Sequence, residues 1–155
     1  MPFSSGILSI NSLVSDQSVV SSITPVDIGV TGSGNTIFSK ALSAGARLEW
    51  SLEGIMTLGA TGGFRLLAHS TTSPTTYNAT FQVVDETTLT TFQDAQLTEA
   101  AFTNAAAVAG NYLLTAYGTI VANTATVFSL QFAQNNSTAN AITMNKGAVI
   151  KLWQF

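Results

Sequence analysis

The stretch Arg47–Leu58, with the sequence RLEWSLEGIMTL, decides the fold class of this chain of 155 residues. Its apolar side chains fall on even-numbered positions, namely Leu48, Trp50, Leu52, Met56 and Leu58. Most odd-numbered positions are polar, and only Ile55 breaks the alternation. A period of two over this length predicts a strand with one buried and one solvated face, because a helix could not bury those residues on one side. Strands of this kind are typical of antiparallel sheets.

Shorter strands are predicted on both sides of this segment. Before it, strands are expected at residues 18–24, 25–30 and 37–42. After it, a turn at residues 59–63 predicts a hairpin in which residues 64–69 pair back. Further strands are expected at residues 77–89, 111–122, 126–134 and 148–155, with Phe128, Leu130 and Phe132 on a core face.

One segment, residues 94–109, shows helical spacing. Leu97, Ala101, Ala105 and Val108 recur every three or four positions, and alanine favours helix. Its Thr and Asn content leaves an ordered loop as an equal alternative. Eight to ten short strands separated by turns predict an all-β fold, an antiparallel two-sheet jelly-roll sandwich with at most one short helix. We expect one domain over residues 16–155, preceded by an arm at residues 1–15.

The chain carries very little charge. Charged residues make up 8% of it, with five Lys and Arg against eight Asp and Glu, whereas about 25% is ordinary. Five scattered cations cannot form the basic patch of a nucleic-acid binder. A monomer of this size exposes roughly 7,500 Å². Either Ser, Thr, Asn and Gln carry the solubility, or much of the surface is buried against other chains, and we favour the second.

The sequence gives no targeting signal. No cation precedes Lys40, so the basic start of a signal peptide is missing, and no apolar run approaches a membrane helix. We expect a protein made in the cytoplasm, without a membrane. With no cysteine, the chain offers no disulfide and no thiol.

The first fifteen residues, MPFSSGILSINSLVS, hold no charge. A frayed terminus is one interpretation. The other is an arm that docks on a partner through its apolar side chains, which are Phe3, Ile7, Leu8, Ile10, Leu13 and Val14.

No constellation of residues predicts catalysis. His69 is the only histidine. Glu49 and Glu53 share a strand face about 13 Å apart, whereas glycosidase carboxyl groups lie roughly 5–10 Å apart. No cysteine or histidine cluster or calcium loop is present. We therefore expect no enzyme, no catalytic residue, no cofactor and no metal.

Aromatic side chains leave carbohydrate binding open, with Trp153, Tyr112 and Tyr117 as candidates. Packing in the core or in a subunit interface is the favoured role for the larger set, which comprises Trp50, Tyr117, Phe128, Phe132, Trp153 and Phe155.

Several stretches resemble a known module. They are residues 118–137 (GTIVANTATVFSLQFAQNNS), 146–152 (KGAVIKL), 42–45 (LSAG), 48–54 (LEWSLEG) and 62–65 (GGFR). Together they resemble the TNF-like jelly-roll module of tailed-bacteriophage virion proteins, which include capsid decoration proteins and fibre tips. The strand containing Phe-Ala-Gln-Asn is the strongest part of the match.

This resemblance implies a homotrimer with a structural role on a virus particle, and no catalytic residue. Only a short segment precedes the module, which favours a small decoration (cement) protein that binds the major capsid protein and stabilises the shell. The alternative is a fibre-tip, receptor-binding module that grips a cell-surface glycan. The expected location is the virion.

Overall fold

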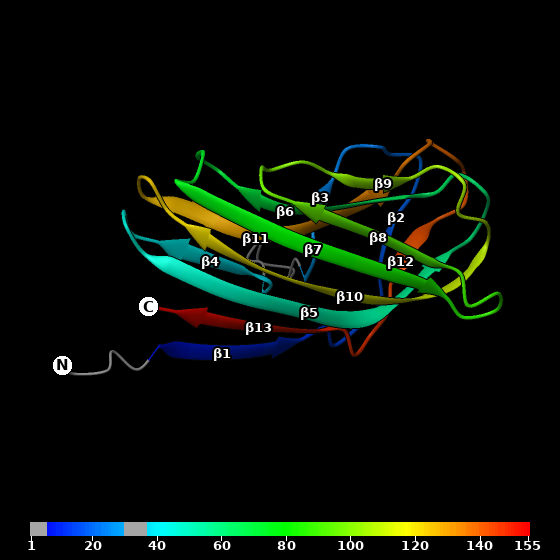
Figure 1. Cartoon of the computed structure of the whole chain (residues 1–155). Helices are drawn as coiled ribbons and strands as arrows, with labels where there is room; N and C mark the ends of the chain where they lie inside the picture. The colour runs from blue at the N-terminus through cyan, green and yellow to red at the C-terminus, as the bar shows by residue number, and fades with distance from the viewer. Residues whose placement is uncertain (1–5, 30–36) are drawn as a thin grey trace.

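The structure, a computed structural model, describes residues 6–29 and 37–155, and within these ranges every regular element is a β-strand (Figure 1). The strands form two antiparallel sheets. The larger sheet contains β1 (Ile7–Ser12), β2 (Gln17–Val19), β5 (Arg47–Leu58), β7 (Thr76–Asp85), β8 (Thr91–Gln96), β10 (Gly110–Val121), β12 (Ile142–Met144) and β13 (Val149–Gln154). The smaller sheet contains β3 (Val26–Asp27), β4 (Ser39–Leu42), β6 (Phe64–Ser70), β9 (Phe102–Asn104) and β11 (Thr126–Gln134).

The long strand β5 organises the larger sheet. Its whole length pairs with β10 on one side, while β13 and β12 share its other side. The main order is β1-β13-β5-β10-β7-β8, and these strands lie side by side in Figure 1. From β5 onward the chain crosses repeatedly between the sheets. The antiparallel two-sheet jelly-roll sandwich predicted from the succession of short strands and turns is thereby confirmed.

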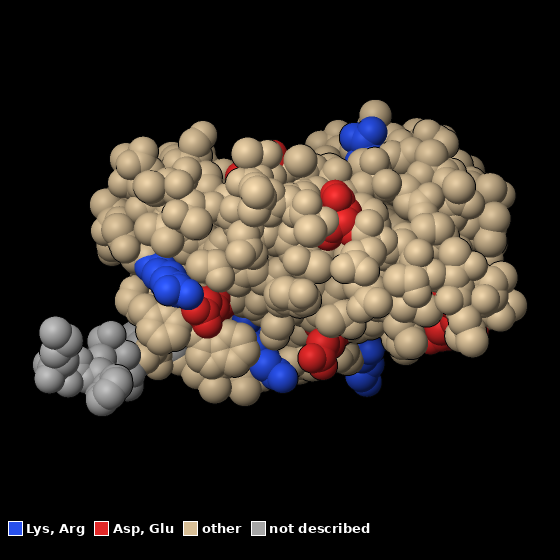
Figure 2. All heavy atoms as spheres, viewed as in Figure 1, with Lys and Arg blue, Asp and Glu red and all other residues tan. Residues whose placement is uncertain are grey.

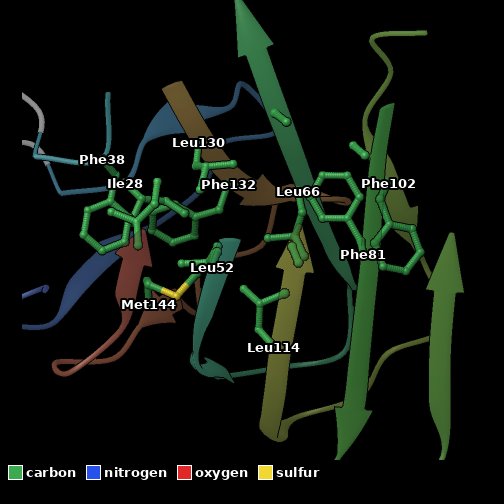
Figure 3. Packing of buried hydrophobic residues seen from close by; sticks show 14 of the residues in the cluster. Ile28, Phe38, Leu52, Leu66, Phe81, Phe102, Leu114, Leu130, Phe132 and Met144 are labelled. Carbon is green, nitrogen blue, oxygen red and sulfur yellow. The ribbon is translucent and has the colours of Figure 1, made fainter. Parts of the chain in front are cut away.

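The core fills the space between the sheets because both present apolar side chains at alternate positions. Leu52, Phe81 and Leu114 of the larger sheet face Leu66, Leu130 and Phe132 of the smaller one (Figure 3). The predicted inner face of β5 is confirmed, since all five even-numbered apolar side chains are buried. Phe128, Leu130 and Phe132 are buried as predicted.

The hairpin predicted after β5 is wrong. Strand β6 pairs with β11 and β9, so the turn at residues 59–63 carries the chain from one sheet to the other. Both β5 and β6 are apolar on one face, and a sandwich buries them best when they face each other across the core.

The helix considered for residues 94–109 is also absent, as is a continuous loop. The first residues of this segment form the end of β8, which pairs with β7. The segment also contains β9, which pairs with β6. Two of the residues with helical spacing point to solvent, Leu97 at 82% exposure and Val108. Strand pairing and burial of Phe102 and Ala107 outweighed the helix propensity of alanine.

The expected boundary at residue 16 does not separate an arm from the sandwich. Residues 7–12 form β1, which pairs with β13 along its whole length, from Ile7 opposite Gln154 to Ser12 opposite Val149. This part of the segment therefore belongs to the larger sheet.

Candidate functional site

The outer face of the larger sheet, which is the face turned away from the smaller sheet, carries the candidate site. Strand register aligns Trp153 of β13 with Glu49 of β5. On the other side of β5, Glu49 lies opposite Thr119 of β10, and Thr119 lies opposite Asn78 of β7. An indole, a carboxylate, a hydroxyl and an amide thus form one row across four strands.

A second row follows two residues further along the strands. Lys151 of β13 lies opposite Ser51 of β5, Ser51 lies opposite Tyr117 of β10, and Tyr117 lies opposite Thr80 of β7. The phenol of Tyr117 is 55% exposed, a large fraction for a tyrosine on a central strand. The small Ser51 side chain leaves space beside the Tyr117 ring, toward Trp153 of the first row.

The two rows enclose a shallow depression of about 440 Å³, which we call the outer hollow. Its lining residues are Glu49, Trp50, Ser51, Asn78, Tyr117, Gly118, Thr119 and Trp153. Its volume lies within the range of small-molecule sites, about 300–1,000 Å³.

The base of the outer hollow is tightly packed. A Cβ added to Gly118 would lie 2.7 Å from the Trp50 ring and would also meet the backbone oxygen of Asn78. Trp50 in turn contacts Phe81 and Phe128, with ring centroids 6.2 and 5.5 Å apart. Only glycine allows β10 and β7 to approach with this indole beneath them, so the base is fixed by the core.

Most polar groups of the outer hollow are available to a ligand. In the part of the chain that the structure describes, the side chains of Ser51, Asn78 and Thr119 make no hydrogen bond. Glu49 is held by an ion pair in which Arg47 Nη2 lies 2.6 Å from Glu49 Oε1. Both partners are exposed, so this pair orients the carboxylate rather than stabilising the fold.

A second pocket of about 550 Å³ lies where the β6–β7 loop meets the segment after β8. Glu99 joins the two parts, because one carboxylate oxygen lies 2.7 Å from His69 Nδ1 and the other accepts the backbone N–H of Ser70 at 3.1 Å. Burial, and then the charge of Glu99, raise the pKa of Tyr77, whose hydroxyl donates to the backbone oxygen of Ala68.

This pocket lacks the geometry of a nucleophile and its base. Among the described residues, the only hydrogen bond of the His69 ring is that with Glu99. The hydroxyl of Ser70 is engaged with Thr72 and Thr126. The His69–Glu99 pair therefore fastens the connection between β8 and β9 onto β6.

The predicted docking residues have different positions. Phe3 lies outside the described residues, and Ile7 lies in β1. Leu8 and Ile10 are exposed on β1 and align with Trp153 and Lys151 of β13, which places them on the outer face. Val14 is 78% exposed.

Leu13 is not available for docking. Its side chain is 6% exposed and belongs to the core of its own chain. Its backbone exchanges hydrogen bonds with Ala148 and Gly147, which turns the side chain inward at the end of β1.

The predicted core or interface set also divides in two. Trp50, Phe128 and Phe132 are buried in the core. Tyr117 and Trp153 meet at the outer hollow, and Phe155 is half exposed.

Tyr112, a candidate for sugar binding, is instead buried. Its hydroxyl donates to the backbone oxygen of Val108 and accepts from the Val108 N–H. Sequence reasoning missed Ser51, Asn78 and Thr119 as partners of the aromatic side chains, because their proximity depends on the register of four strands. Alternation along β5 and β10 could have placed Ser51 and Thr119 on the outer face.

Within residues 6–29 and 37–155, no three His, Cys, Asp or Glu side chains lie where they could hold a metal ion. The same ranges contain no helix long and apolar enough to cross a bilayer. A scan against protein-family models matches no family, and searches of curated proteins and of solved structures find no match. Function must therefore be inferred from this chain's own residues.

Proposed function

We propose that this chain is a structural protein of a virus particle, a homotrimer that decorates a phage capsid and stabilises the shell by binding its major capsid protein. The resemblance of residues 118–137 and 146–152 to the phage jelly-roll module supports this role. The low charge supports it too, because few charges need to be desolvated when a neutral surface is covered. Figure 2 shows the face in view as largely neutral, with a few charged side chains, most of them in its lower part, where blue and red groups lie next to each other.

The observation that carries the proposal is an apolar strip along one edge of the larger sheet. We define it as Leu8 and Ile10 on β1 together with Val14, two residues beyond the end of β1, and all three are exposed. Isolated exposed apolar residues are ordinary, but these three follow one another within a segment that has no charge. In the described ranges, β1 pairs only with β13, so it is also an edge strand. An exposed apolar edge strand without charge tends to associate with other chains. In the proposed complex, the capsid shell buries this strand.

Trimerisation strengthens this contact. Three protomers present three apolar strips, so modest affinity at each one becomes strong attachment where the shell sites match their spacing. Closed three-fold symmetry also stops assembly at the trimer, so that no open-ended polymer forms.

The test combines sedimentation with binding to shells. We expect the purified protein to sediment as a trimer at micromolar concentration and to co-sediment with empty capsids of the virus that encodes it. A double variant, Leu8→Ser with Ile10→Ser, is expected to remain a folded trimer and to lose capsid binding. Val127→Ser, at an exposed position of the smaller sheet, is the matched control and is expected to bind normally.

A stable monomer, or a double variant that still decorates capsids, would contradict the proposal. Immuno-electron microscopy separates the two virion roles. Label on the shell supports the decoration protein, whereas label on the tail supports the alternative, a fibre tip.

A further inference from the structure

We propose that the outer hollow is a carbohydrate site that takes a neutral hexopyranose unit between Trp153 and Tyr117. This inference goes beyond the proposed structural role, and it stands or falls on other measurements. It concerns the described face of one protomer and uses no residue of the apolar strip.

The spacing of the two aromatic side chains fits one sugar ring. Trp153 and Tyr117 stand on β13 and β10, which flank β5 on its two sides. Neighbouring strands lie about 4.8 Å apart, and Trp153 lies opposite Glu49 whereas Tyr117 lies opposite Ser51. The two positions are therefore also offset by two residues along the strands, and their backbones are about 12 Å apart. A ring in van der Waals contact with an aromatic face on each side needs roughly 7–8 Å. The diagonal between them crosses β5 between Glu49 and Ser51, and the small Ser51 side chain keeps its part of that space open.

The polar groups of the outer hollow match the rim of a pyranose. A sugar ring offers C–H faces to aromatic side chains and a belt of hydroxyl groups that both donate and accept. Asn78 offers a donor and an acceptor, and the hydroxyls of Ser51 and Thr119 can each do both. These three side chains have no hydrogen-bond partner within the described residues, so binding a sugar costs no internal bond.

The charges around the outer hollow favour a neutral ligand. Glu49 is neutralised by Arg47 in the ion pair at 2.6 Å. On neighbouring strands, Lys151 lies beside Ser51, and Glu53 lies beside Val149. Two cations and two carboxylates therefore balance on this face, and no local excess of either sign selects a phosphate, a sialic acid or an amine. The remaining oxygen of Glu49 can accept a sugar hydroxyl.

The base of the outer hollow is already in place before binding. Gly118 fits closely over Trp50, which packs against Phe81 and Phe128 in the core. A preformed site does not lose affinity to the ordering of its own backbone. The binding energy therefore comes from the aromatic walls and the free polar groups.

Tryptophan fluorescence provides a direct assay. The chain has two tryptophans, and Trp50 is 2% exposed, so a ligand in the outer hollow acts mainly on the emission of Trp153. The probes are neutral oligosaccharides of glucose, galactose and mannose, titrated to millimolar concentration. We expect a saturable change with at least one of them. For variants that lack Trp153, isothermal titration calorimetry with the same oligosaccharide measures the affinity.

Trp153→Ala and Tyr117→Ala are each expected to weaken binding by about tenfold or more. Leu113→Ala is the matched control, because Leu113 is an exposed residue of the same face of β10 and lies outside the lining of the outer hollow. It is expected to bind like the wild type. Unfolding curves of all three variants confirm that they are folded.

No saturable change with any probe, or equal affinity in all three variants, would overturn the inference. The outcome is independent of the structural role. A trimer that binds capsids but no sugar removes the carbohydrate site and leaves the proposed function. A monomer that binds sugar through Trp153 removes the trimer and leaves the carbohydrate site.

Discussion

Trp50 and Trp153 lie on neighbouring strands of the larger sheet, in opposite environments. Trp50 is opposite Leu152 on the inner face, where it is buried among aromatic rings. Trp153, one residue further along β13, is only partly buried and borders the outer hollow. The difference arises because successive side chains of a strand point to opposite faces of the sheet, so the two indoles have different roles. The inner one stabilises the sandwich, and the outer one is left free for a ligand or a partner.

The largest expected effect tests this assignment directly. Trp50→Ala is expected to destabilise the fold by about 3–5 kcal/mol, as large-to-small core substitutions do. Trp153→Ala, on the outer face of the same sheet, is expected to cost no more than about 1 kcal/mol. Urea unfolding of the two variants measures both values. Similar losses of stability in the two variants would show that the faces are not distinct.

Just after β1, two adjacent residues allow the same comparison between a buried side chain, that of Leu13, and an exposed one, that of Val14. Leu13→Ala removes a core side chain and is expected to cost about 2–4 kcal/mol. Val14→Ala removes an exposed one and is expected to change stability by no more than about 0.5 kcal/mol. Thermal unfolding distinguishes them. If Leu13→Ala were as stable as Val14→Ala, β1 would contribute nothing to the core.

Gly118 lies between the two faces. Gly118→Ala is expected to cost about 1–3 kcal/mol, because the new methyl group must displace the Trp50 ring or separate β10 from β7. Thr119→Ala, the next residue on the outer face, is expected to leave the unfolding curve unchanged. Denaturant titration of the pair checks this. An unchanged midpoint in Gly118→Ala would mean that Trp50 can move aside without loss.

The smallest effect concerns Asp85 at the turn between β7 and β8. The backbone N–H groups of Thr87 and Thr88 donate to Asp85 Oδ1 and lower the pKa of this carboxyl. Its charged form therefore stabilises the fold above the ordinary aspartate pKa of about 3.9, and that contribution is lost as the pH falls through the lower folded pKa. We expect the difference in Tm between wild type and Asp85→Asn to be constant from about pH 5 to 7.

Below about pH 4 that difference is expected to shrink. Melting curves across this range measure it. A difference that stays constant down to the acid limit would show that the two backbone N–H groups do not favour the charged form.

Sequence patterns located the central strands well because their alternation is determined locally. Arg47–Leu58 and Thr126–Gln134 form strands with the predicted bounds, since each strand carries a long apolar face. The segment at residues 94–109 misled the same reasoning. Its alanines have no strong preference for one face, so pairing with β7 and β6 decided its structure.

The outer hollow was only partly foreseeable. Tyr117 and Trp153 were candidates from residue type alone, but Tyr112 was an equal candidate and is buried. Alternation separates Tyr112 from Tyr117 only when the direction of the inner face is known. The approach of Asn78 and Thr119 depends on the pairing of β7 with β10, which joins residues far apart in the sequence.

The pairing of β1 with β13 also constrains how the chain reaches its native state. Ile7 lies opposite Gln154, so the ladder at this edge joins segments from the two ends of the sequence. Contacts between residues so distant slow folding, since the intervening chain must first be brought together. The central pair β5 and β10 can form before this edge closes. We therefore expect β1 to be the last strand to pair during refolding and the first to lose its protection in native-state hydrogen exchange.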